Sequence, residues 1–384
     1  MLTPPRLLVI TELFLPTKGG TAVWFDAAYR RLGGKDIHIV TADVPGSKAV
    51  DHDHPNSIHR VSLKRHAWLR PESLAMYSRL LLKGLAVALR HRISAVHAGR
   101  VLPEGLVGWA IARLTRTPIV IYAHGEEIMT WRQAGKFKAM RFAYRHADRV
   151  IANSDFTRAE LLKLGVQSDR LSLIFPGVDI DRFKPDLAAD HLRASLGLRA
   201  DQKLILSVGR LSRRKGFDQV IQALPKLAEE NIDAHYALIG IGEDFDYLTD
   251  LARTLGVVDR VHMLGHVSAD DLPLWYNACD VFAMPNREID GDTEGFGMVF
   301  LEAAACGKPC IAGDAGGTGS AVEDGVTGYR VDGNDLGQIA SSFVALLRDK
   351  ALCHTFGQAG HARAVNDFSW DAVTRKTRAL IQSH

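Results

Sequence analysis

The chain has 384 residues, with 47 Lys and Arg, 44 Asp and Glu, and a formal net charge of +3. This length exceeds that of a single ordinary core and predicts two domains, each large enough to be stable alone. No apolar stretch reaches the ~20 residues that span a bilayer, and the opening residues lack a basic-then-apolar leader. These features argue against a secreted or membrane-spanning protein, and we expect a cytoplasmic one.

The charge is divided unevenly along the chain. Residues 1–180 hold 26 Lys and Arg against 15 Asp and Glu, a net +11, whereas residues 181–384 hold 21 against 29, a net −8. A basic first half suits anionic lipid headgroups or a phosphorylated substrate. Nucleic acid is not expected as a partner, because no recognition motif accompanies the charge.

Short apolar runs alternate with amphipathic helical patterns along the whole chain, which indicates βαβ units and parallel sheets. The pattern predicts two Rossmann-like, doubly wound α/β domains, 1–180 and 181–365, followed by a C-terminal helical segment, 366–384. In such folds ligands bind beyond the carboxyl ends of the strands, so we expect the ligand in a cleft that the domains face. The predicted strands are residues 7–11, 37–41, 95–98, 119–123 and 149–152 in the first domain, and 203–208, 235–240, 260–264, 281–284 and 310–312 in the second.

Two loops that follow predicted strands carry features of phosphate sites. Gly19 and Gly20 precede a helix, where paired glycines let the backbone approach a phosphate and leave amides free; a flexible Gly-Gly turn is the alternative. The dinucleotide fingerprint is absent there, which argues against a nicotinamide enzyme. In the second domain, Arg210 leaves a strand and Lys215 lies where the next helix begins, so both side chains can converge on a diphosphate. A solvated basic loop is the alternative.

Glu294 and Glu302 bracket the run Glu-Gly-Phe-Gly-Met-Val-Phe-Leu-Glu. The first carboxylate lies on a glycine-flanked turn with free helix-start amides, and the second is expected two turns into the helix that follows, which should end at Gly307. Two such carboxylates can accept hydrogen bonds from two sets of hydroxyls, as sugars and riboses present. A helix with one glutamate near its positive end and one solvated glutamate is the alternative.

His124 closes a predicted strand, which directs it into the cleft, although a satisfied core histidine remains possible. After it, the cations Lys136, Lys138, Arg141, Arg145 and Arg149 are interleaved with Phe137, Phe142 and Tyr144. This pattern, and the stretch from Lys64 to Arg70 with Trp68 and the helix that follows it, suit a membrane interface. An ordinary packing helix is the alternative for both.

Metal ligation is not expected. The four cysteines, Cys279, Cys306, Cys310 and Cys353, have no metal-ligand spacing, and Cys306 and Cys310 suit small buried positions. The Asp-x-Asp triplets are scattered, which favours chance over a metal site, and the run from Asp51 to His54 fits a solvated loop. The triplets lie at residues 51–53, 179–181, 244–246 and 290–292.

Taken together, these residues resemble glycosyltransferase family 4, the retaining enzymes of the GT-B fold, across essentially the whole chain. The stretch from Phe282 to Gly313 looks especially like the phosphatidylinositol mannosyltransferase branch. The chain departs from the family where Thr318-Gly319-Ser320 replaces the usual Pro-Glu pair after Gly316-Gly317. The landmarks, in the family's order, are Gly19-Gly20, His124-Gly125, Pro176-Gly177-Val178-Asp179 with Phe183, Gly209-Arg210 with Lys215-Gly216, Glu294 with Glu302, and the tail Phe368-Ser369-Trp370.

The resemblance implies a nucleotide-sugar donor held mostly by the C-terminal domain and an acceptor, lipid-linked or a polysaccharide precursor, on the first. GDP-mannose leads as donor, with UDP-sugars close behind, and the last helix crosses back to the first domain. It also implies metal-independent transfer without a cofactor, and possible peripheral attachment to the inner face of the cell membrane. The implied roles are diphosphate neutralisation by Arg210 and Lys215, sugar placement by Glu294 and the amides of Gly295, Phe296, Gly297 and Met298, sugar contact by His124, ribose binding by Glu302, and phosphate approach by Gly19 and Gly20.

Two other functions remain open at this point. A non-hydrolysing nucleotide-sugar epimerase has the same fold but needs further cleft carboxylates and histidines, which the sequence does not identify. A non-catalytic sugar-binding module is disfavoured by the Arg210 and Lys215 pair. The acceptor, its linkage position and the oligomeric state are not determined by the sequence.

Overall fold

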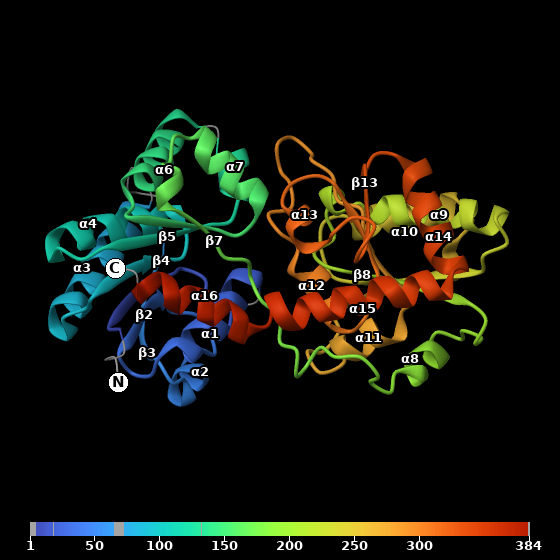
Figure 1. Cartoon of the computed structure of the whole chain (residues 1–384), viewed down its shortest axis with the longest axis horizontal. Helices are drawn as coiled ribbons and strands as arrows, with labels where there is room; N and C mark the ends of the chain where they lie inside the picture. Colours follow the sequence, from blue (N-terminus) through green and yellow to red (C-terminus); the bar gives the residue numbers. More distant parts are fainter. Residues whose placement is uncertain (1–4, 18, 65–72, 132, 383–384) are drawn as a thin grey trace. The chain divides into compact units, whose positions relative to one another are not determined.

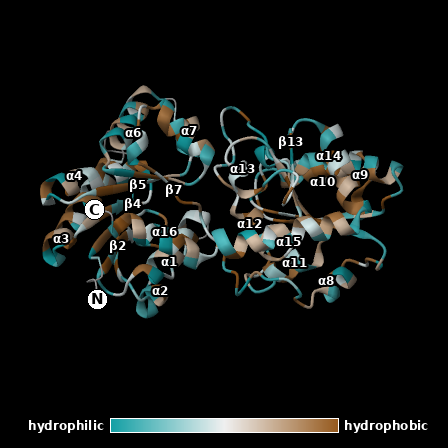
Figure 2. Cartoon of the chain, viewed as in Figure 1, coloured by the Kyte–Doolittle hydropathy of each residue, from teal (hydrophilic) through white to brown (hydrophobic). Residues whose placement is uncertain are grey.

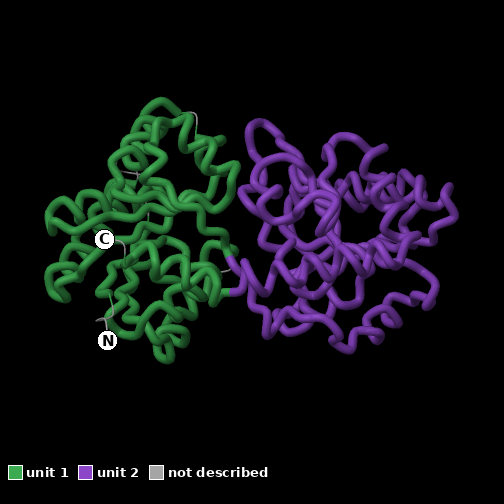
Figure 3. Tube along the Cα trace, viewed as in Figure 1, with its two compact units in different colours: residues 1–176, 370–384 green, residues 177–369 purple. Residues whose placement is uncertain are grey.

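The computed structural model describes residues 5–17, 19–64, 73–131 and 133–382. The chain divides into two compact units (Figure 3): unit 1 comprises Met1–Pro176 with Trp370–His384, and unit 2 comprises Gly177–Ser369. Both divisions lie within a few residues of the predicted limits, 180 and 366. The stretch 65–70, which we singled out for a membrane interface, lies outside the described residues.

The sheet of unit 1 contains seven strands among the described residues, all parallel, in the order β3-β2-β1-β4-β5-β6-β7 (Figure 1). The central strands are apolar and buried, as expected when helices cover both faces of a parallel sheet. The strands are β1 (Leu7–Ile10), β2 (Ile37–Ala42), β3 (Ser57–Val61), β4 (Ala95–Ala98), β5 (Ile119–Ala123), β6 (Arg149–Ala152) and β7 (Leu171–Leu173).

The helices of unit 1 connect these strands, and one of them comes from the end of the chain. α16 packs against α1, where Asp371 pairs with Arg31 Nε at 3.3 Å and Arg378 donates to the Arg31 carbonyl at 3.0 Å. The predicted return of the last helix to the first domain is confirmed. The helices are α1 (Gly20–Leu32), α2 (Ser47–Asp53), α3 (Leu74–His91), α4 (Leu106–Thr115), α5 (Glu126–Thr130), α6 (Ala134–His146), α7 (Asp155–Lys163) and α16 (Trp370–Gln382), with short turns η1 (Val101–Gly105) and η2 (Ser168–Arg170).

Unit 2 repeats the architecture with a sheet of six described strands, all parallel, in the order β10-β9-β8-β11-β12-β13. Figure 2 shows hydrophobic colouring along the strands of both units. The strands are β8 (Lys203–Val208), β9 (Ala234–Ile239), β10 (Val261–Gly265), β11 (Val281–Met284), β12 (Cys310–Gly313) and β13 (Gly328–Val331). The helices are α8 (Asp190–Ser195), α9 (Phe217–Glu229), α10 (Phe245–Thr254), α11 (Leu272–Ala278), α12 (Met298–Ala305), α13 (Thr318–Ala321), α14 (Leu336–Arg348) and α15 (Lys350–Asp367), with short turns η3 (Arg213–Lys215) and η4 (Val258–Arg260).

Each unit is therefore a doubly wound α/β fold, as predicted, and all ten predicted strands are present with ends that differ by at most one residue. Three strands were not predicted: β3, β7 and β13. Among the described helices, none is both long and apolar enough to cross a membrane.

Candidate functional site

The carboxyl end of β8 leads into a loop whose glycines are required by close packing. A Cβ on Gly209 would lie 3.2 Å from Cδ of Lys215, so the glycine leaves room for the lysine stem. Gly216 has a φ of 73°, and a Cβ there would lie 2.0 Å from the carbonyl oxygen of Pro285. The short turn η3 between them thereby directs Lys215 toward the residues that follow β11.

Lys215 and Arg214 both bind the carboxylate of Glu294. Lys215 Nζ lies 2.7 Å and Arg214 Nη1 lies 2.9 Å from the same oxygen, Oε2, and Arg214 Nε also pairs with Asp292 at 3.1 Å. Burial raises the pKa of Glu294, but the two cations outweigh burial and bring the pKa to about 2. Glu294 is therefore an ionised hydrogen-bond acceptor at neutral pH and is unsuited to donate a proton.

A short turn, residues 295–297, separates Glu294 from the start of α12 at Met298. Gly297 takes a left-handed conformation with φ 85°, and a Cβ there would strike the Phe300 ring at 2.7 Å. Gly297 is the residue before the helix and Met298 its first residue, whereas Gly295 and Phe296 lie in the preceding turn; a ligand role for these amides stays a prediction. The Phe296 side chain, however, is buried and packs edge-on against Phe368, so its ring is not available to a ligand.

Glu302 lies in α12 and accepts a hydrogen bond from the Tyr276 hydroxyl at 2.7 Å. Burial raises its pKa to about 7, a shift that Tyr276 and the charge of Arg182 reduce. Our expectation of two turns between the helix start and Glu302 was wrong. The helix begins at Met298 and ends at Ala305, because the left-handed Gly297 delays its start, so Glu302 lies little more than one turn inside.

Glu302 predicts a measurable pH dependence of folding. A carboxyl group whose pKa is raised in the folded state stabilises the fold fully below the unfolded value, about 4.5, and this contribution is lost as pH rises through about 7. We expect the melting temperature of Glu302→Gln to fall less than that of the wild type between pH 5 and pH 8. Circular dichroism melts at each pH measure this. Parallel curves for the two proteins would contradict the raised pKa.

Arg210 is exposed and its Nε pairs with Glu243 Oε2 at 3.1 Å, whereas Lys215 pairs with Glu294. Their convergence on a diphosphate stays a prediction. Glu243 follows Gly240 and Gly242, whose close contact with the backbone of Gly209 and Leu211 explains that glycine pair without a ligand.

The loop that departs from the family pattern packs on the backbone of Glu294. Gly316 has φ 72°, a Cβ there would lie 2.2 Å from the Glu294 carbonyl oxygen, and the Gly317 amide donates to that oxygen at 2.8 Å. Thr318 begins α13 and donates to the Gly313 carbonyl at 2.6 Å. The loop thus supports the backbone of Glu294 without the Pro-Glu pair.

Carboxylates of the Asp-x-Asp triplets are tied to arginines or to their own turns. Asp51 pairs with Arg60, Asp244 with Arg213, and Asp292 with Arg214. Asp179 accepts from the amides of residues 181 and 182. The expectation of a solvated loop at residues 51–54 was wrong: residues 51–53 end α2, and His54 is buried against Asp26 at 2.8 Å. All four cysteines are unpaired; Cys306 and Cys310 are buried, as predicted, and burial raises the pKa of both thiols.

In unit 1, His124 follows β5 and is half-buried. Its Nε2 lies 2.8 Å from the Gly99 carbonyl oxygen, its amide donates to Glu127 at 3.0 Å, and its ring meets Trp24 edge-on. Burial lowers the pKa of His124, although the charge of Glu127 opposes the shift, so the imidazole is neutral near pH 7. His124 is thus oriented at the carboxyl end of its strand.

The glycine pair of unit 1 is at the start of α1. Gly19 has φ 136° and is the residue before the helix, and Gly20 is its first residue. Both glycines are exposed, and no atom lies within 4 Å of the position that a Cβ on Gly19 would take. The backbone at Gly19 is therefore open to a ligand, as the phosphate prediction requires.

The basic pattern around α6 has two faces. Met140, Ala143 and Tyr144 are buried, and Tyr144 donates a short hydrogen bond of 2.5 Å to Glu127. The prediction that Tyr144 belongs to a membrane interface was wrong, because the helical period places it with Met140 on the core side. The opposite face exposes Lys138, Arg141 and Arg145, whereas Lys136 is exposed in the first turn, with its ammonium group 3.8 Å from the centre of the Trp131 ring.

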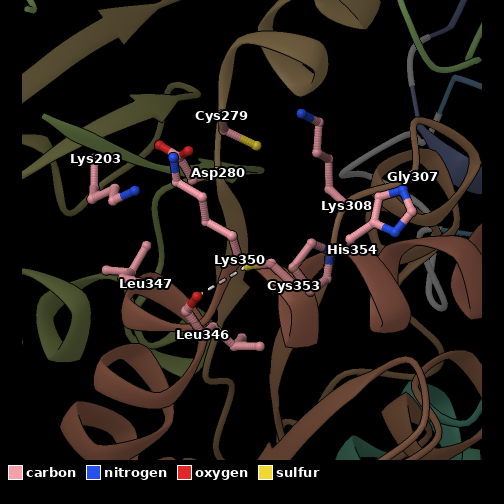
Figure 4. Close-up of a pocket in the computed structure, with 11 residues that line it drawn as sticks. Lys203, Cys279, Asp280, Gly307, Lys308, Leu346, Leu347, Lys350, Cys353 and His354 are labelled. Carbon is pink, nitrogen blue, oxygen red and sulfur yellow. Dashed lines mark hydrogen bonds between the residues drawn. The ribbon is translucent and has the colours of Figure 1, made fainter. Parts of the chain in front are cut away.

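Unit 2 also contains a pocket that lies away from Lys215 and Glu294 (Figure 4). It has a volume of about 260 Å³ and is lined by Lys203, Asp280, Lys308 and His354, among others. Lys203 begins β8, and Asp280 and Lys308 precede β11 and β12. The pocket therefore lies at the amino-terminal edge of the sheet, opposite the Lys215–Glu294 pair, and concavity does not identify the functional edge here.

Two doubly wound Rossmann-like units, each built on a parallel sheet, are the architecture of the GT-B class. The chain belongs to glycosyltransferase family 4. Residues 18–182 match the model "Glycosyltransferase Family 4" and residues 189–363 match "Glycosyl transferases group 1". This membership favours glycosyl transfer over the epimerase and the non-catalytic binding module.

Relatives and solved structures agree with the family. The chain is 33% identical over 370 residues, 95% of each chain, to a GDP-mannose-dependent alpha-(1-6)-phosphatidylinositol monomannoside mannosyltransferase of Mycolicibacterium smegmatis. It is 32% identical over 289 residues, 70% of this chain and 65% of the relative, to a D-inositol 3-phosphate glycosyltransferase of Thermobifida fusca. The fold matches Anabaena HepE in complex with UDP, with a TM-score of 0.85 and 22% identity over 99% of this chain and all of the other.

Sequence reasoning missed Arg214 and Tyr276, the direct partners of the two glutamates. Arg214 stands between Arg213 and Lys215, and the sequence cannot tell which of three consecutive cations turns inward. Tyr276 lies 26 residues before Glu302 in another helix. A buried carboxylate needs a donor, which is the one signal that could have prompted a search for such a partner.

Proposed function

We propose that this protein transfers a hexose from a nucleotide-diphosphate sugar, with GDP-mannose as the leading donor and UDP-sugars next, to a lipid-linked or polysaccharide-precursor acceptor. The observation that carries the proposal is the contact of Lys215 and Arg214 with Glu294 beside the start of α12. GDP-mannose is favoured because that donor appears in the name of a relative that matches 95% of the chain.

The cations of unit 2 can stabilise the negative charge that forms when a sugar–phosphate bond breaks. Negative charge develops on the leaving diphosphate, and Lys215, Arg210 and the amides from Gly295 to Met298 can stabilise it. Glu294, ionised and held by two cations, would accept hydrogen bonds from the sugar. Glu302 would accept them from ribose, while Tyr276 fixes the orientation of its carboxylate.

We propose groups of unit 1 for the remaining roles. His124, oriented by Gly99 and Glu127, is the residue of this unit that contacts the sugar. The open backbone at Gly19 and Gly20 approaches the phosphates. Retention of the anomeric configuration is proposed from the resemblance to the retaining family. Because we identify no covalent nucleophile among the described residues, we propose transfer on the same face of the sugar, with the leaving phosphate accepting the acceptor's proton.

A donor screen tests the proposal. The full chain is incubated with GDP- and UDP-sugars, with and without lipid extract, in excess EDTA, and release of nucleoside diphosphate is measured. We expect release from GDP-mannose that increases with lipid extract, and an anomeric proton in the NMR spectrum of the product that shows retention. Activity that is abolished by EDTA and restored by Mn²⁺ would overturn the metal-independent mechanism, and an inverted product would overturn retention.

The exposed cations of α6 predict reversible attachment to anionic membranes. Neutralising Lys136, Lys138 and Arg141 to Gln should weaken binding to anionic vesicles and leave the fold intact, and wild-type binding should fall with salt because exposed charges are screened over ~10 Å at 0.1 M. Vesicle sedimentation measures both. Arg141 also donates to the Leu164 carbonyl at 3.1 Å, so a Lys136/Lys138 double variant separates charge from folding.

The control for this experiment removes two exposed lysines from unit 2, Lys226 and Lys350. That variant should bind vesicles as the wild type does. Equal binding of the wild type to neutral and anionic vesicles, or none to either, would count against a lipid-phase acceptor and favour a soluble one.

A further inference from the structure

Three histidines from three elements of unit 1 lie close together: His38 of β2, His59 of β3 and His91 of α3. One ring nitrogen from each lies within 4.8 Å of the others. His38 Nδ1 and His59 Nε2 are 3.2 Å apart, and the rings of His38 and His91 have centroids 3.9 Å apart. His38 is buried and the other two are half-buried, so the cluster reaches solvent on one side.

The sheet register explains why these side chains meet. β2 and β3 are parallel, with Val40 opposite His59. Side chains two residues apart in a strand share a face, so His38 and His59 lie on the same face of the sheet. His91 is the last residue of α3, a helix that contacts both strands on this face.

Two of the three imidazoles, those of His38 and His59, are in a chemical state that suits ligation. Burial lowers the pKa of His38, and the charge of His91 lowers it further, against the opposing effect of Asp36. Burial lowers the pKa of His59 to about 4, with further contributions from His38, Lys83, His91 and Arg90. Neutral imidazole, which offers a lone pair, is the form that binds metals.

We propose that His38, His59 and His91 form a binding site for a divalent transition metal of the zinc class. Imidazole nitrogens bind Zn²⁺ at about 2.0–2.1 Å, which in a tetrahedral site places them ~3.4 Å from one another. The His38–His59 pair already has this spacing, and the remaining separations close by rotation of half-buried rings. Water takes the fourth position.

The site is structural, because it lies at the edge of the sheet away from the proposed chemistry. His38 is the second residue of β2, and α3 ends where the chain returns to the amino end of β4. His124, in contrast, follows the carboxyl end of β5. A bound metal would fasten the edge strand β3 to β2 and α3, so occupancy should change stability and leave turnover unchanged.

Unit 2 provides a matched control in the same register. His235 of β9 and His262 of β10 lie 3.1 Å apart with stacked rings, and His262 is opposite Ala237, two residues after His235. In place of a third histidine, Gln202 contacts His235 at 3.1 Å. This pair has two imidazoles instead of three and should not hold the metal.

The test is titration of the chelator-treated full chain with Co²⁺, followed by visible absorption, and then displacement of the Co²⁺ by Zn²⁺. We expect the wild type and His262→Gln each to bind one equivalent of Co²⁺, with the intense visible absorption bands of four-coordinate Co²⁺. The bands should be lost in His59→Asn and in His91→Gln. Free Co²⁺ at one hundred times its dissociation constant should raise the melting temperature by about 5–10 °C. Only the proteins that show the absorption bands should be stabilised in this way.

Several results would overturn the proposal. Absence of the bands from the wild type is one, and their survival in both His59→Asn and His91→Gln is another, because binding would then be adventitious. Loss of the bands in His262→Gln or in a His52→Ala variant would assign the metal to other histidines. His91 is half-buried at a helix end, so its variant remains informative if His59→Asn fails to fold.

Discussion

Replacement of Lys215 by alanine is expected to lower kcat by about 10²-fold or more, the effect of removing one donor that stabilises transition-state charge. Lys215 is mostly buried and its ammonium group lies 2.7 Å from Glu294. If the leaving diphosphate is neutralised here, this charge matters most as the sugar–phosphate bond breaks, so kcat should fall more than KM rises.

Two further variants sharpen the experiment. Lys215→Arg should restore only part of the activity, since a planar guanidinium does not reproduce a compact ammonium charge. Arg213→Ala is the control on the same turn, because Arg213 pairs with Asp244 and lies over the Tyr247 ring, away from Glu294. Arg213→Ala should keep near-normal kcat. Equal losses in Lys215→Ala and Arg213→Ala would mean that the turn tolerates no substitution and that Lys215 has no special role.

The fold was predictable because its strongest signal is simple: buried parallel strands form continuous apolar runs. The three strands that escaped prediction lack that signal. β3 contains Ser57, His59 and Arg60 and is half-buried throughout, β13 begins with glycine and contains Arg330, and β7 has only three residues. Each of these strands is held in its sheet by pairing with a strand that the sequence did predict: β3 with β2, β7 with β6 and β13 with β12.

The candidate site was predictable at the level of residue type and less so at the level of contacts. Glycines and glutamates at helix starts suggested a ligand, but residue type does not separate that role from packing, since Gly216 and Gly297 are also required by close contacts. Which cation meets which carboxylate depends on the turn of η3, where Arg214 and Lys215 bind Glu294 and Arg213 binds Asp244. The histidine cluster depends on register between β2 and β3, and the sequence did not reveal β3.

Replacement of Glu294 and replacement of Glu302 should impair the enzyme in different ways. Glu302→Ala should mainly raise the donor KM, because ribose is bound alike in the ground and transition states. Glu294→Ala should mainly lower kcat, because the placement of the sugar matters most as the bond breaks. Each loss should amount to about 2–4 kcal/mol in kcat/KM, as for one charged hydrogen bond.

The structure shows how to separate these roles from damage to the fold. Glu294→Ala leaves two partly buried cations without their shared carboxylate, so Glu294→Gln, which keeps the shape, is the informative companion. Tyr276→Phe leaves Glu302 in place but removes its 2.7 Å donor, and should raise the donor KM less than Glu302→Ala does. Initial rates over a donor series, with melting temperatures of each variant, measure both effects. If Glu294→Ala and Glu302→Ala both keep wild-type kinetics with a confirmed donor, neither glutamate binds the donor. If Glu302→Ala lowers kcat and leaves KM unchanged, Glu302 and not Glu294 positions the sugar.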